Sequence, residues 1–560
     1  MHTCKYLCAY TKFQMYSGDQ INIQQYNTNH FQGWNLLNKY PPVGLLIPSL
    51  LIILLMIAPV IYLLIRGFEN PGNLIDILTN NKTAIILLRS LLLVITVTIT
   101  CLLITIPLSW ILTRSSMPFR KSFFILCTLP LVIPSYVGAF IIISLSSRSG
   151  MLFPVLNTLG VDQIPKIHGL VGSTIVISLL SYPYLLLPMC AAMAKLNPLM
   201  EEAARSLGKN HLTTFLKVTL PQLKPAIFSG ALLICLYTLS DFGAVSLMRY
   251  ETFTWAIFQH FNTSIDRSMA ANLSLVLLLV ATIIIFMQIR YRGNKSYHHT
   301  GSGAQRNNLS IRLGKLNLLA LFFCSSIVIV SIIFPIGTLI YWVIKAMINN
   351  QSFYLNWSYT WNSLIVSSIG AALIMLFAVP SATLIVRHPN KFTKFFEFTS
   401  YFGYLLPGIV VALSILYFCI NYFDFIYQSL LILILGYAVL FFPAALISTR
   451  DMIIRISPNI EESAKLLGAN TYHTLTKITL PLMLPGIITG TALVFLITIK
   501  ELPLTLILGP LDFHTLATTI WDRTNEAFFA QSAVYSLILI GISVIPLLLL
   551  SKEMNPLRDE

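Results

Sequence analysis

The stretch EEAARSLGKNHLTTFLKVTLP (residues 201–221) occurs a second time as EESAKLLGANTYHTLTKITLP (residues 461–481). The two copies align without a gap at an offset of 260, and eleven of the 21 positions are identical. Both copies are polar segments in a chain that is otherwise strongly apolar. A polar segment repeated so closely at such a distance indicates an internal duplication and predicts two halves that are built alike.

The composition is that of an integral membrane protein. Of the 560 residues, 56% are hydrophobic and only 10% are charged, whereas soluble domains carry about 25% charged residues. Apolar runs of about 20 residues are long enough to cross the hydrocarbon layer as helices. The sequence does not contain the short alternating segments that a membrane β-barrel needs. We therefore expect an all-α integral membrane fold.

The apolar runs predict about twelve transmembrane helices, six on each side of a basic segment rich in Gly, Ser and Asn. The predicted spans are residues 43–65, 84–112, 122–145, 170–194, 223–247, 270–290, 317–344, 361–386, 395–420, 429–447, 483–507 and 531–551. The predicted domains are a polar N-terminal cytoplasmic tail (1–42), a first transmembrane repeat (43–290), a cytoplasmic linker (291–315), a second transmembrane repeat (316–552) and a C-terminal tail (553–560). The N-terminal tail lacks a signal-peptide pattern, and a start placed too early is an alternative interpretation of it.

Basic residues are distributed unevenly between the predicted loops. With the N-terminus inside, the inner loops hold 21 Lys and Arg residues and the outer loops hold eight. This positive-inside pattern places both termini and both copies of the repeated stretch in the cytoplasm. It also accounts for the net charge of +15 without nucleic acid as a partner. Both repeats then start on the same side, so they are parallel, and a cleft or pore is expected between them.

Matching positions continue outside the repeated stretch. They are Arg89-Ser90 with Asn362-Ser363, Pro107 with Pro380, Arg114 with Arg387 and Pro134 with Pro407 at an offset of 273, and Tyr182-Pro183 with Phe442-Pro443 at 260. The prolines inside spans fit helices that bend or break beside a cavity, or else packed kinks.

Each copy of the repeated stretch carries the signals of two short helices joined by a glycine. A polar residue and a proline precede it, which predicts a capped helix start at Asn197-Pro198 and at Ser457-Pro458. Gly208 and Gly468 predict left-handed caps that end the first helix. The second helix is predicted to run to the Leu-Pro pairs, Leu220-Pro221 and Leu480-Pro481. The result is a helix–glycine–helix elbow outside the membrane.

The elbows carry candidate contacts for a partner. Paired glutamates stand in the first turn, where negative charge suits the helix dipole: Glu201, Glu202, Glu461 and Glu462. The small residues that follow would let another surface approach closely: Ala203, Ala204, Ser463 and Ala464. Two equivalent elbows predict two equivalent partner sites. The simpler alternative is a pair of loops that only connect spans.

The elbow sequences resemble the EAA loop of permease subunits of binding-protein-dependent ABC importers. That pattern has a Glu-Ala-Ala core, a glycine four residues after the second alanine and a hydrophobic-x-Leu-Pro ending, and Ser463 replaces one alanine here. The resemblance implies a type I ABC importer permease fold over residues 45–550, in which each elbow docks into a groove of an ATP-binding subunit. It further implies two copies of that subunit, a periplasmic substrate-binding protein, and a location in the bacterial inner membrane.

Three segments resemble the fused, two-repeat permeases of ferric iron importers. They are LPLVIPSYVGAF (129–140), LSDFGAVSLMRYETFTWAIFQ (239–259) and KELPLTLILGPLDFHTLATTIW (500–521). Related fused permeases handle thiamine, so a permease for thiamine or another small solute is the alternative to one for ferric iron.

The sequence contains no Walker A motif. We therefore expect ATP-Mg in the partner subunits, no cofactor in this chain, and a translocation pore subunit rather than an enzyme. Two alternatives belong to other classes. A secondary transporter driven by an ion gradient would suit parallel repeats but needs no repeated elbow, and a membrane-embedded enzyme would need converging catalytic side chains, which the sequence does not indicate.

Two acidic residues occupy equivalent places inside predicted spans. Asp241 and Glu501 are separated by the same offset of 260, and Lys500 is next to Glu501. Ionisable groups at membrane depth are costly unless they are paired or in contact with water. They are therefore predicted either to line the translocation path or its outer gate, or to form an interhelical ion pair that fixes the two halves. No set of residues has the spacing of metal ligands, and His298-His299 is interpreted as a pair of ordinary polar linker residues without a metal-binding role.

Overall fold

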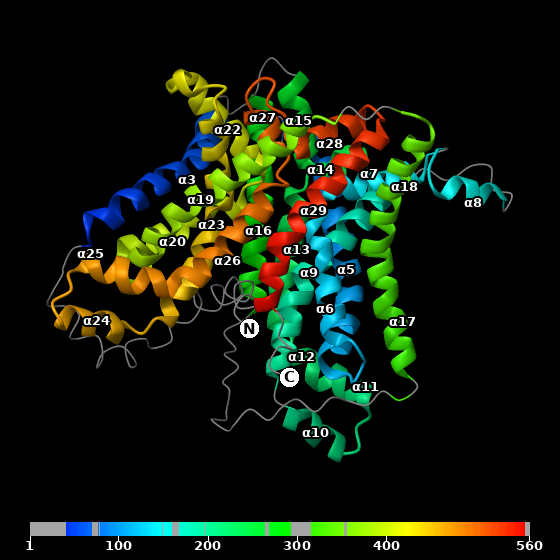
Figure 1. Ribbon diagram of the computed structural model, residues 1–560, viewed down its shortest axis with the longest axis horizontal. Helices are drawn as coiled ribbons and strands as arrows, with labels where there is room; N and C mark the ends of the chain where they lie inside the picture. Colours follow the sequence, from blue (N-terminus) through cyan, green and yellow to red (C-terminus); the bar gives the residue numbers. More distant parts are fainter. Residues whose placement is uncertain are drawn as a thin grey trace. The chain divides into compact units, whose positions relative to one another are not determined.

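The computed structural model describes residues 41–69, 77, 79–147, 149–158, 167–196, 198–263, 268–292, 314, 316–351 and 355–554. Within these ranges every regular element is a helix (Figure 1), so the predicted all-α fold is confirmed. Nine helices of the described part are long and apolar enough to cross a membrane, and three bent helix pairs raise this number to as many as twelve. The number agrees with the predicted spans. Nearly all of the polar tail, most of the linker and the last residues of the chain lie outside the described ranges.

The helices follow one another in the same order in both halves. The first half contains α3 (Val43–Glu69), α5 (Asn81–Arg114), α6 (Arg120–Thr128), η2 (Leu129–Val132), α7 (Ser135–Leu145), α8 (Leu152–Thr158), α9 (Gly169–Lys195), α10 (Pro198–Ser206), α11 (His211–Thr214), η3 (Phe215–Thr219), α12 (Leu220–Gln222), α13 (Lys224–Ser240), α14 (Gly243–Leu247), α15 (Phe253–Thr263) and α16 (Ser268–Arg292). The second half contains α17 (Leu316–Val328), η4 (Ile329–Ile333), α18 (Phe334–Ile348), α19 (Trp357–Arg387), α20 (Lys391–Ser400), α21 (Phe402–Leu405), α22 (Gly408–Tyr422), η5 (Asp424–Ile426), α23 (Leu430–Arg455), α24 (Pro458–Leu466), α25 (Thr471–Thr474), η6 (Leu475–Thr479), α26 (Leu480–Thr498), α27 (Pro503–Leu508), α28 (Leu516–Asn525) and α29 (Phe529–Met554).

The third predicted span of each half is a broken helix. In the first half, α6 with η2 meets α7 at an angle of 89°, and in the second half α20 with α21 meets α22 at 110°. Pro134 and Pro407 occupy the N-cap positions of α7 and α22. Proline has no backbone N–H, and it disfavours the helical conformation for the residue before it. The first half-helix therefore ends before the proline, and each prediction of one continuous span is corrected to two helices.

The described residues form two compact units that do not follow the two sequence halves. Unit 1 comprises the described residues of Gly72–Asn356 and Thr518–Glu560, and unit 2 comprises those of Lys12–Pro71 and Trp357–Ala517. The first span of each repeat therefore packs with helices of the other repeat. The predicted domain limits describe the order along the chain, and they remain a prediction.

In unit 2, α3 lies against α19 and α22. The hydroxyl groups of Ser49 and Ser381 are 3.2 Å apart, which joins α3 to α19. The rings of Tyr62 and Tyr417 have their centroids 5.1 Å apart, and the guanidinium of Arg66 lies 4.8 Å from the centre of the Tyr417 ring. These contacts tie the first span of the chain to the second repeat.

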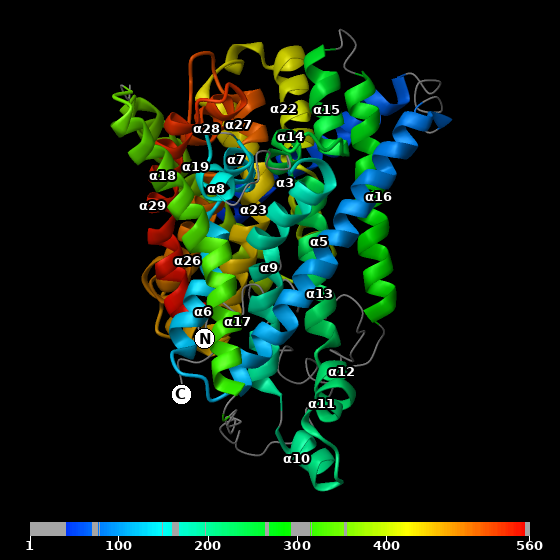
Figure 2. The same ribbon diagram turned by 90° about the vertical axis from the view of Figure 1, so that its right-hand side faces the viewer.

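In unit 1, α17 and α18 take the corresponding place beside the first repeat. α17 contacts α6, and α18 contacts α7 and α29 (Figure 2). The ring of Phe529 packs on Trp342 from α18 and on Phe140 from α7, with centroid distances of 5.1 and 5.8 Å. The exchange of first spans is therefore present in both units.

The repeated serines Ser90 and Ser363 accept hydrogen bonds from the first residues of two helices, α15 and α28. Ser90 Oγ accepts a hydrogen bond from the N–H of Phe253, the first residue of α15, at 3.2 Å. Ser363 Oγ accepts one from the N–H of Leu516, the first residue of α28, at 2.7 Å. Each serine thus satisfies one of the free N–H groups at a helix start from a neighbouring span. This contact explains why the serine is present in both halves.

Candidate functional site

Both predicted elbows are present in the structure. The glycines that end α10 and α24 have positive φ, 79° at Gly208 and 89° at Gly468. The N–H of the next residue donates to the carbonyl five positions earlier, at 3.2 Å from Lys209 and 3.0 Å from Ala469. This is the Schellman pattern of a glycine C-cap. In Figure 2, α10 and α11 lie beyond the ends of α9 and α13.

The second helix of each elbow starts at an asparagine that is identical in the two copies. Asn210 Oδ1 accepts a hydrogen bond from the N–H of Thr213 at 2.7 Å. Asn470 Oδ1 accepts one from the N–H of His473 at 2.7 Å. Asparagine is among the best N-cap residues because its side chain replaces the missing intrahelical acceptor. These two caps were not predicted, although the identity of this position in both copies was a signal for them.

A π-helical turn follows in both copies, η3 and η6. In each turn the N–H of the leucine before the repeated proline, Leu220 or Leu480, donates to the carbonyl five residues back. The proline that follows has no N–H to continue the α pattern, and the wider turn accommodates its ring. Each turn ends at a buried threonine, Thr219 or Thr479.

The Leu-Pro pair stands at the start of the next helical element in both copies, as predicted, and the backbone stays helical through the pair. In the first copy Pro221 lies within α12, and the chain bends by 67° only between Gln222 and Lys224. In the second copy Pro481 lies in a continuous helix from Tyr472 to Thr498. A proline near the start of a helical segment costs little because its N–H is not needed there.

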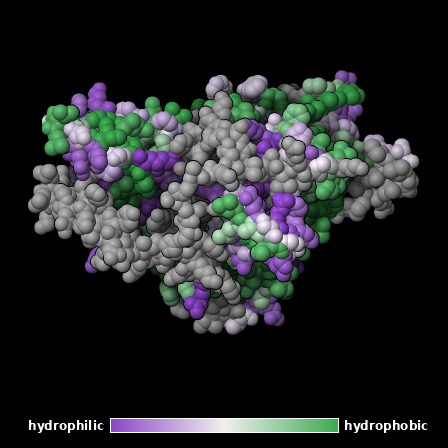
Figure 3. All heavy atoms as spheres, turned by 90° about the horizontal axis from the view of Figure 1, so that it is seen from below, coloured by the Kyte–Doolittle hydropathy of each residue, from purple (hydrophilic) through white to green (hydrophobic). Residues whose placement is uncertain are grey.

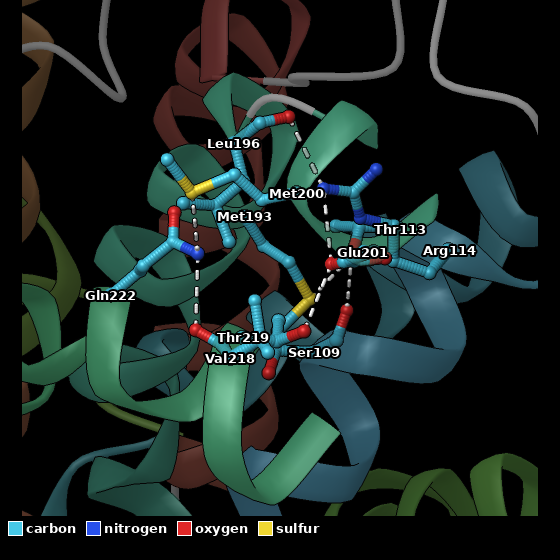
Figure 4. A network of polar contacts seen from close by, with 10 residues as sticks. All are labelled: Ser109, Thr113, Arg114, Met193, Leu196, Met200, Glu201, Val218, Thr219 and Gln222. Atoms are coloured by element: carbon cyan, nitrogen blue, oxygen red, sulfur yellow. Dashed lines mark hydrogen bonds and ion pairs between the residues drawn. The ribbon is translucent and has the colours of Figure 1, made fainter. Parts of the chain in front are cut away.

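The first glutamate of α10 faces its own unit (Figure 4). Glu201 Oε1 accepts a hydrogen bond from Thr219 Oγ1 at 2.9 Å, and it lies 3.7 Å from Nη2 of Arg114, the last residue of α5. The same nitrogen of Arg114 donates to the carbonyl of Leu196, just before α10, at 3.2 Å. The Arg114 side chain is only 2% exposed. We call these four residues the first clamp, and they join α10 to the ends of α5, α9 and η3.

The second clamp has the same members, and its ion pair is closer. Arg387, the last residue of α19, donates from Nη2 and Nε to Glu461 Oε1 at 3.0 and 3.2 Å. Arg387 Nη2 also donates to the carbonyl of Ile456 at 3.1 Å, and Thr479 Oγ1 donates to Glu461 Oε1 at 3.1 Å. Both charged side chains are at most 10% exposed. The elbow is therefore held by a buried, charge-assisted network.

The surroundings of a histidine beside the second clamp disfavour its charged form. His388 directly follows Arg387 in the sequence. Burial, together with the ammonium group of Lys465 in α24, lowers the pKa of His388. A positive charge on the imidazole next to α24 is therefore disfavoured.

The two glutamates of each pair point in different directions. Glu201 and Glu461 belong to the clamps, whereas Glu202 and Glu462 are exposed. The small residues divide in the same way, with exposed side chains at Ala203 and Ser463, a half-buried one at Ala204 and a buried one at Ala464. Of these paired glutamates and small residues, the second glutamate and the first small residue of each copy are therefore the exposed ones.

Large apolar side chains are exposed around both glycines. Leu207 is 81% exposed and the equivalent Leu467 is 89% exposed. Leu212 and the equivalent Tyr472 are 68% and 75% exposed. Figure 3 shows the molecule from below, the side on which α10 lies in Figure 1, and hydrophobic and hydrophilic residues lie next to one another there. Exposed apolar groups at equivalent places of two polar elbows mark a surface for a protein partner.

The predicted caps before the elbows have different outcomes. Ser457 is the N-cap residue of α24, with Pro458 after it, but its side chain makes no capping hydrogen bond. The reason is that the N–H of Ile460 donates to the backbone carbonyl of Ser457 at 3.1 Å. The side-chain cap predicted at Ser457 is therefore wrong, whereas Pro458 is placed as predicted. Asn197 lies outside the described residues.

Substitution of Gly468 tests the left-handed cap. No atom lies within 4 Å of a Cβ built at this position, so the cost of a side chain there is conformational. We expect Gly468→Val to destabilise the elbow by about 1–2 kcal/mol, because a β-branched residue disfavours positive φ. Gly468→Asn should be milder because asparagine tolerates this conformation. Thermal unfolding of the purified protein checks the order, and equal losses for Val and Asn would contradict the cap.

Asp241 and Glu501 lie at equivalent breaks, as their offset predicts. Asp241 separates α13 from α14 in unit 1, and Glu501 separates α26 from α27 in unit 2. Asp241 is buried, whereas Lys500 and Glu501 are partly exposed. Whether these three residues line a translocation path or its gate, or form an ion pair that fixes the two halves, remains a prediction.

Metal-binding residues do not cluster in the described part of the chain. No group of three or more His, Cys, Asp and Glu side chains there could hold a metal ion. His298-His299 lies outside the described residues. The elbows and their clamps are therefore the candidate site that the structure supports best.

Comparisons with known proteins show the family of the chain. Residues 105–293 and 374–554, which include both elbows, each match a family model described as binding-protein-dependent transport system inner membrane component. The Fe(3+)-transport system permease protein FbpB 2 of Haemophilus influenzae is 36% identical over 520 residues, or 92% of this chain and 99% of that protein. The ferric transport system permease protein FbpB of Actinobacillus pleuropneumoniae is 21% identical over 432 residues, 74% of this chain and 63% of that protein.

A more distant relative matches less of the chain. The sulfate transport system permease protein CysW of Synechocystis sp. is 28% identical over 203 residues, which cover 34% of this chain and 72% of that protein. The family model, by contrast, matches once in each half, as the duplication requires. The chain therefore belongs to the binding-protein-dependent transport system inner membrane components, as a fused two-repeat permease of an ABC importer.

Proposed function

We propose that the chain is the inner-membrane permease subunit of an ATP-driven importer for ferric iron. The observation that carries this proposal is the 36% identity, over 92% of the chain, to a protein named as an Fe(3+) transport permease. In this reading a periplasmic binding protein delivers iron, and the helices cross the lipid bilayer with both termini in the cytoplasm. The chain itself forms the pore and catalyses no reaction.

The energy comes from partner subunits in this proposal. Two copies of an ATP-binding subunit dock on the two elbows, and they hold the ATP and Mg²⁺, so the permease needs no cofactor of its own. The exposed leucines Leu207 and Leu467 support this, because each lies at the glycine of its elbow and is more than four-fifths exposed. Two equivalent surfaces also favour a stoichiometry of two ATP-binding subunits to one fused permease.

The clamps give the elbows a mechanical connection to the spans. When the ATP-binding subunits close, each elbow moves with the subunit that holds it. Arg114 and Arg387 stand at the ends of α5 and α19, so a displaced Glu201 or Glu461 pulls on these long helices. Because the network is buried and charge-assisted, it resists separation under such a load. The pull would drive alternating access of the two repeats.

Uptake by a deletion strain tests the substrate. We expect a strain that lacks this permease to lose uptake of labelled ferric iron and to keep thiamine uptake, and the plasmid-borne chain should restore iron uptake. The matched control is a chain with Glu202→Arg and Glu462→Arg, which changes only exposed positions of the elbows and should abolish the rescue. Loss of thiamine uptake with normal iron uptake would instead favour a thiamine permease.

A further inference from the structure

Asp241 and Glu501 differ by one methylene group and cap equivalent short helices. Asp241 Oδ1 accepts hydrogen bonds from the N–H groups of Ala244 and Val245, at 2.9 and 3.4 Å, inside α14. Glu501 Oε1 accepts one from the N–H of Leu504, inside α27, at 3.4 Å. Each carboxylate therefore holds the start of the short helix that follows the break in its span.

Each carboxylate also lies beside the start of a second helix. In unit 1 the hydroxyl of Ser135, the first residue of α7, lies at the start of α14, 3.1 Å from the position of a Cβ built on Gly243. The equivalent residue in unit 2, at the offset of 273 that also relates Pro134 to Pro407, is Gly408, the first residue of α22. A Cβ built on Gly408 would lie 2.6 Å from Oε1 of Glu501, which is too close for two unbonded atoms.

The partners of the two carboxylates are therefore matched in size. The shorter aspartate is accompanied by a serine at the start of α14, whereas the longer glutamate fills the space that a glycine leaves free. In both units the negative charge lies where two helices start, and helix N-termini favour negative charge. This meeting point of two helix starts, which we call a corner, is thus built twice with different side chains.

We propose that Asp241 with Ser135, and Glu501 with Gly408, are two matched pairs of positioning residues that join the break in the third span to the break in the fifth span of each repeat. The pairs fix the directions in which α7 and α14, or α22 and α27, leave their breaks. A side chain at position 408 would displace the Glu501 carboxylate rather than the backbone, because the carboxylate is the end of a flexible side chain. The pairs should then be exchangeable between the two corners as units, but not one residue at a time.

The test is a double-mutant cycle in unit 2. We expect Gly408→Ser to lower the uptake rate about tenfold, the usual effect of losing a charge-assisted hydrogen bond. Glu501→Asp alone should also lower uptake, because the shorter side chain no longer reaches both helix starts. The double variant Gly408→Ser with Glu501→Asp recreates the pair of unit 1 and should recover to within about twofold of the original protein.

Two further measurements keep the test independent of substrate and of folding. Thermal unfolding of the purified variants should show the same recovery in the double variant, whatever solute the permease carries. Gly370→Ser is the matched control, because a Cβ at that position makes only ordinary contacts, at 3.5 Å and beyond, and it should leave unfolding and uptake unchanged. The reverse exchange in unit 1, Ser135→Gly with Asp241→Glu, should give faster uptake and a higher unfolding temperature than Asp241→Glu alone. A double variant no better than its worse single variant, in either unit, would overturn the proposal.

Discussion

Arg387→Ala is expected to lower the free energy of unfolding by about 3–5 kcal/mol, because it leaves a buried carboxylate without its cation. Within the described part of the chain, Glu461 would keep the hydrogen bond from Thr479 alone, and the carbonyl of Ile456 would lose the donor Arg387. Arg114→Ala should cost less, because its ion pair is longer, at 3.7 Å, and Glu201 is 17% exposed. Thermal unfolding of the purified permease and its yield in the membrane measure both effects.

A second variant separates stability from force transmission. Arg387→Met with Glu461→Leu removes both charges together, and replacing a buried ion pair by apolar residues often restores stability. We expect the double variant to unfold close to the original temperature but to transport poorly, because α24 has lost its link to α19. Lys391→Ala removes an exposed cation of the same unit and serves as the control. If the double variant transported at the original rate, the clamp would have only a structural role.

Leu207→Glu combined with Leu467→Glu is expected to weaken binding of the ATP-binding subunits about 100-fold or more. A leucine that becomes buried at an interface contributes about 1.5–3 kcal/mol, and each 1.4 kcal/mol is a factor of ten in Kd. Both side chains are over four-fifths exposed, so the permease itself should fold normally. Co-purification and titration with the isolated ATP-binding subunit measure the effect.

The single variants and one control sharpen this prediction. Leu207→Glu alone and Leu467→Glu alone should each leave one ATP-binding subunit bound, which mass measurement of the complex shows. Phe425→Glu alters an apolar residue that is equally exposed, at 85%. Phe425 lies in η5, which comes before α23, whereas the elbow helix α24 comes after α23. This change lies at the far end of α23 from the elbow and should leave binding unaffected. If Phe425→Glu weakened binding as much, the elbows would not be the docking surface.

The elbows could be predicted from local sequence signals because their determinants are close together in the chain. Gly208 and Gly468 end a helix for a reason that acts within one turn, the tolerance of glycine for positive φ. The same holds for Pro458 at a helix start. The side-chain cap at Ser457 was predicted wrongly, because a backbone carbonyl of the same residue took its place as acceptor.

The clamps could not be predicted in the same way, because their members are far apart in the sequence. Arg114 is 87 residues before Glu201, and Arg387 is 74 residues before Glu461. The signal was nevertheless present, since both the arginines and the glutamates recur in the two halves. The sequence does not show that α5 packs on α9 and that α19 packs on α23, which brings each arginine to its own elbow.

The exchange of first spans was also beyond prediction from the sequence. A span such as α3 is apolar on all sides, so its composition fits packing against either repeat equally well. Specific contacts decide the outcome, among them the approach of Ser49 to Ser381 and of Tyr62 to Tyr417. Small and aromatic residues of this kind occur on many faces of the spans, so they do not single out a partner.

Transport by the purified protein tests the central claim most directly. Proteoliposomes would contain the permease with or without its ATP-binding subunit, and uptake of labelled ferric iron from the loaded binding protein would be followed. We predict uptake only when the ATP-binding subunit and Mg-ATP are both present, and none with a proton gradient alone. Sustained uptake by the permease alone under a proton gradient would contradict the account, because transport would then not need an ATP-binding subunit on the elbows.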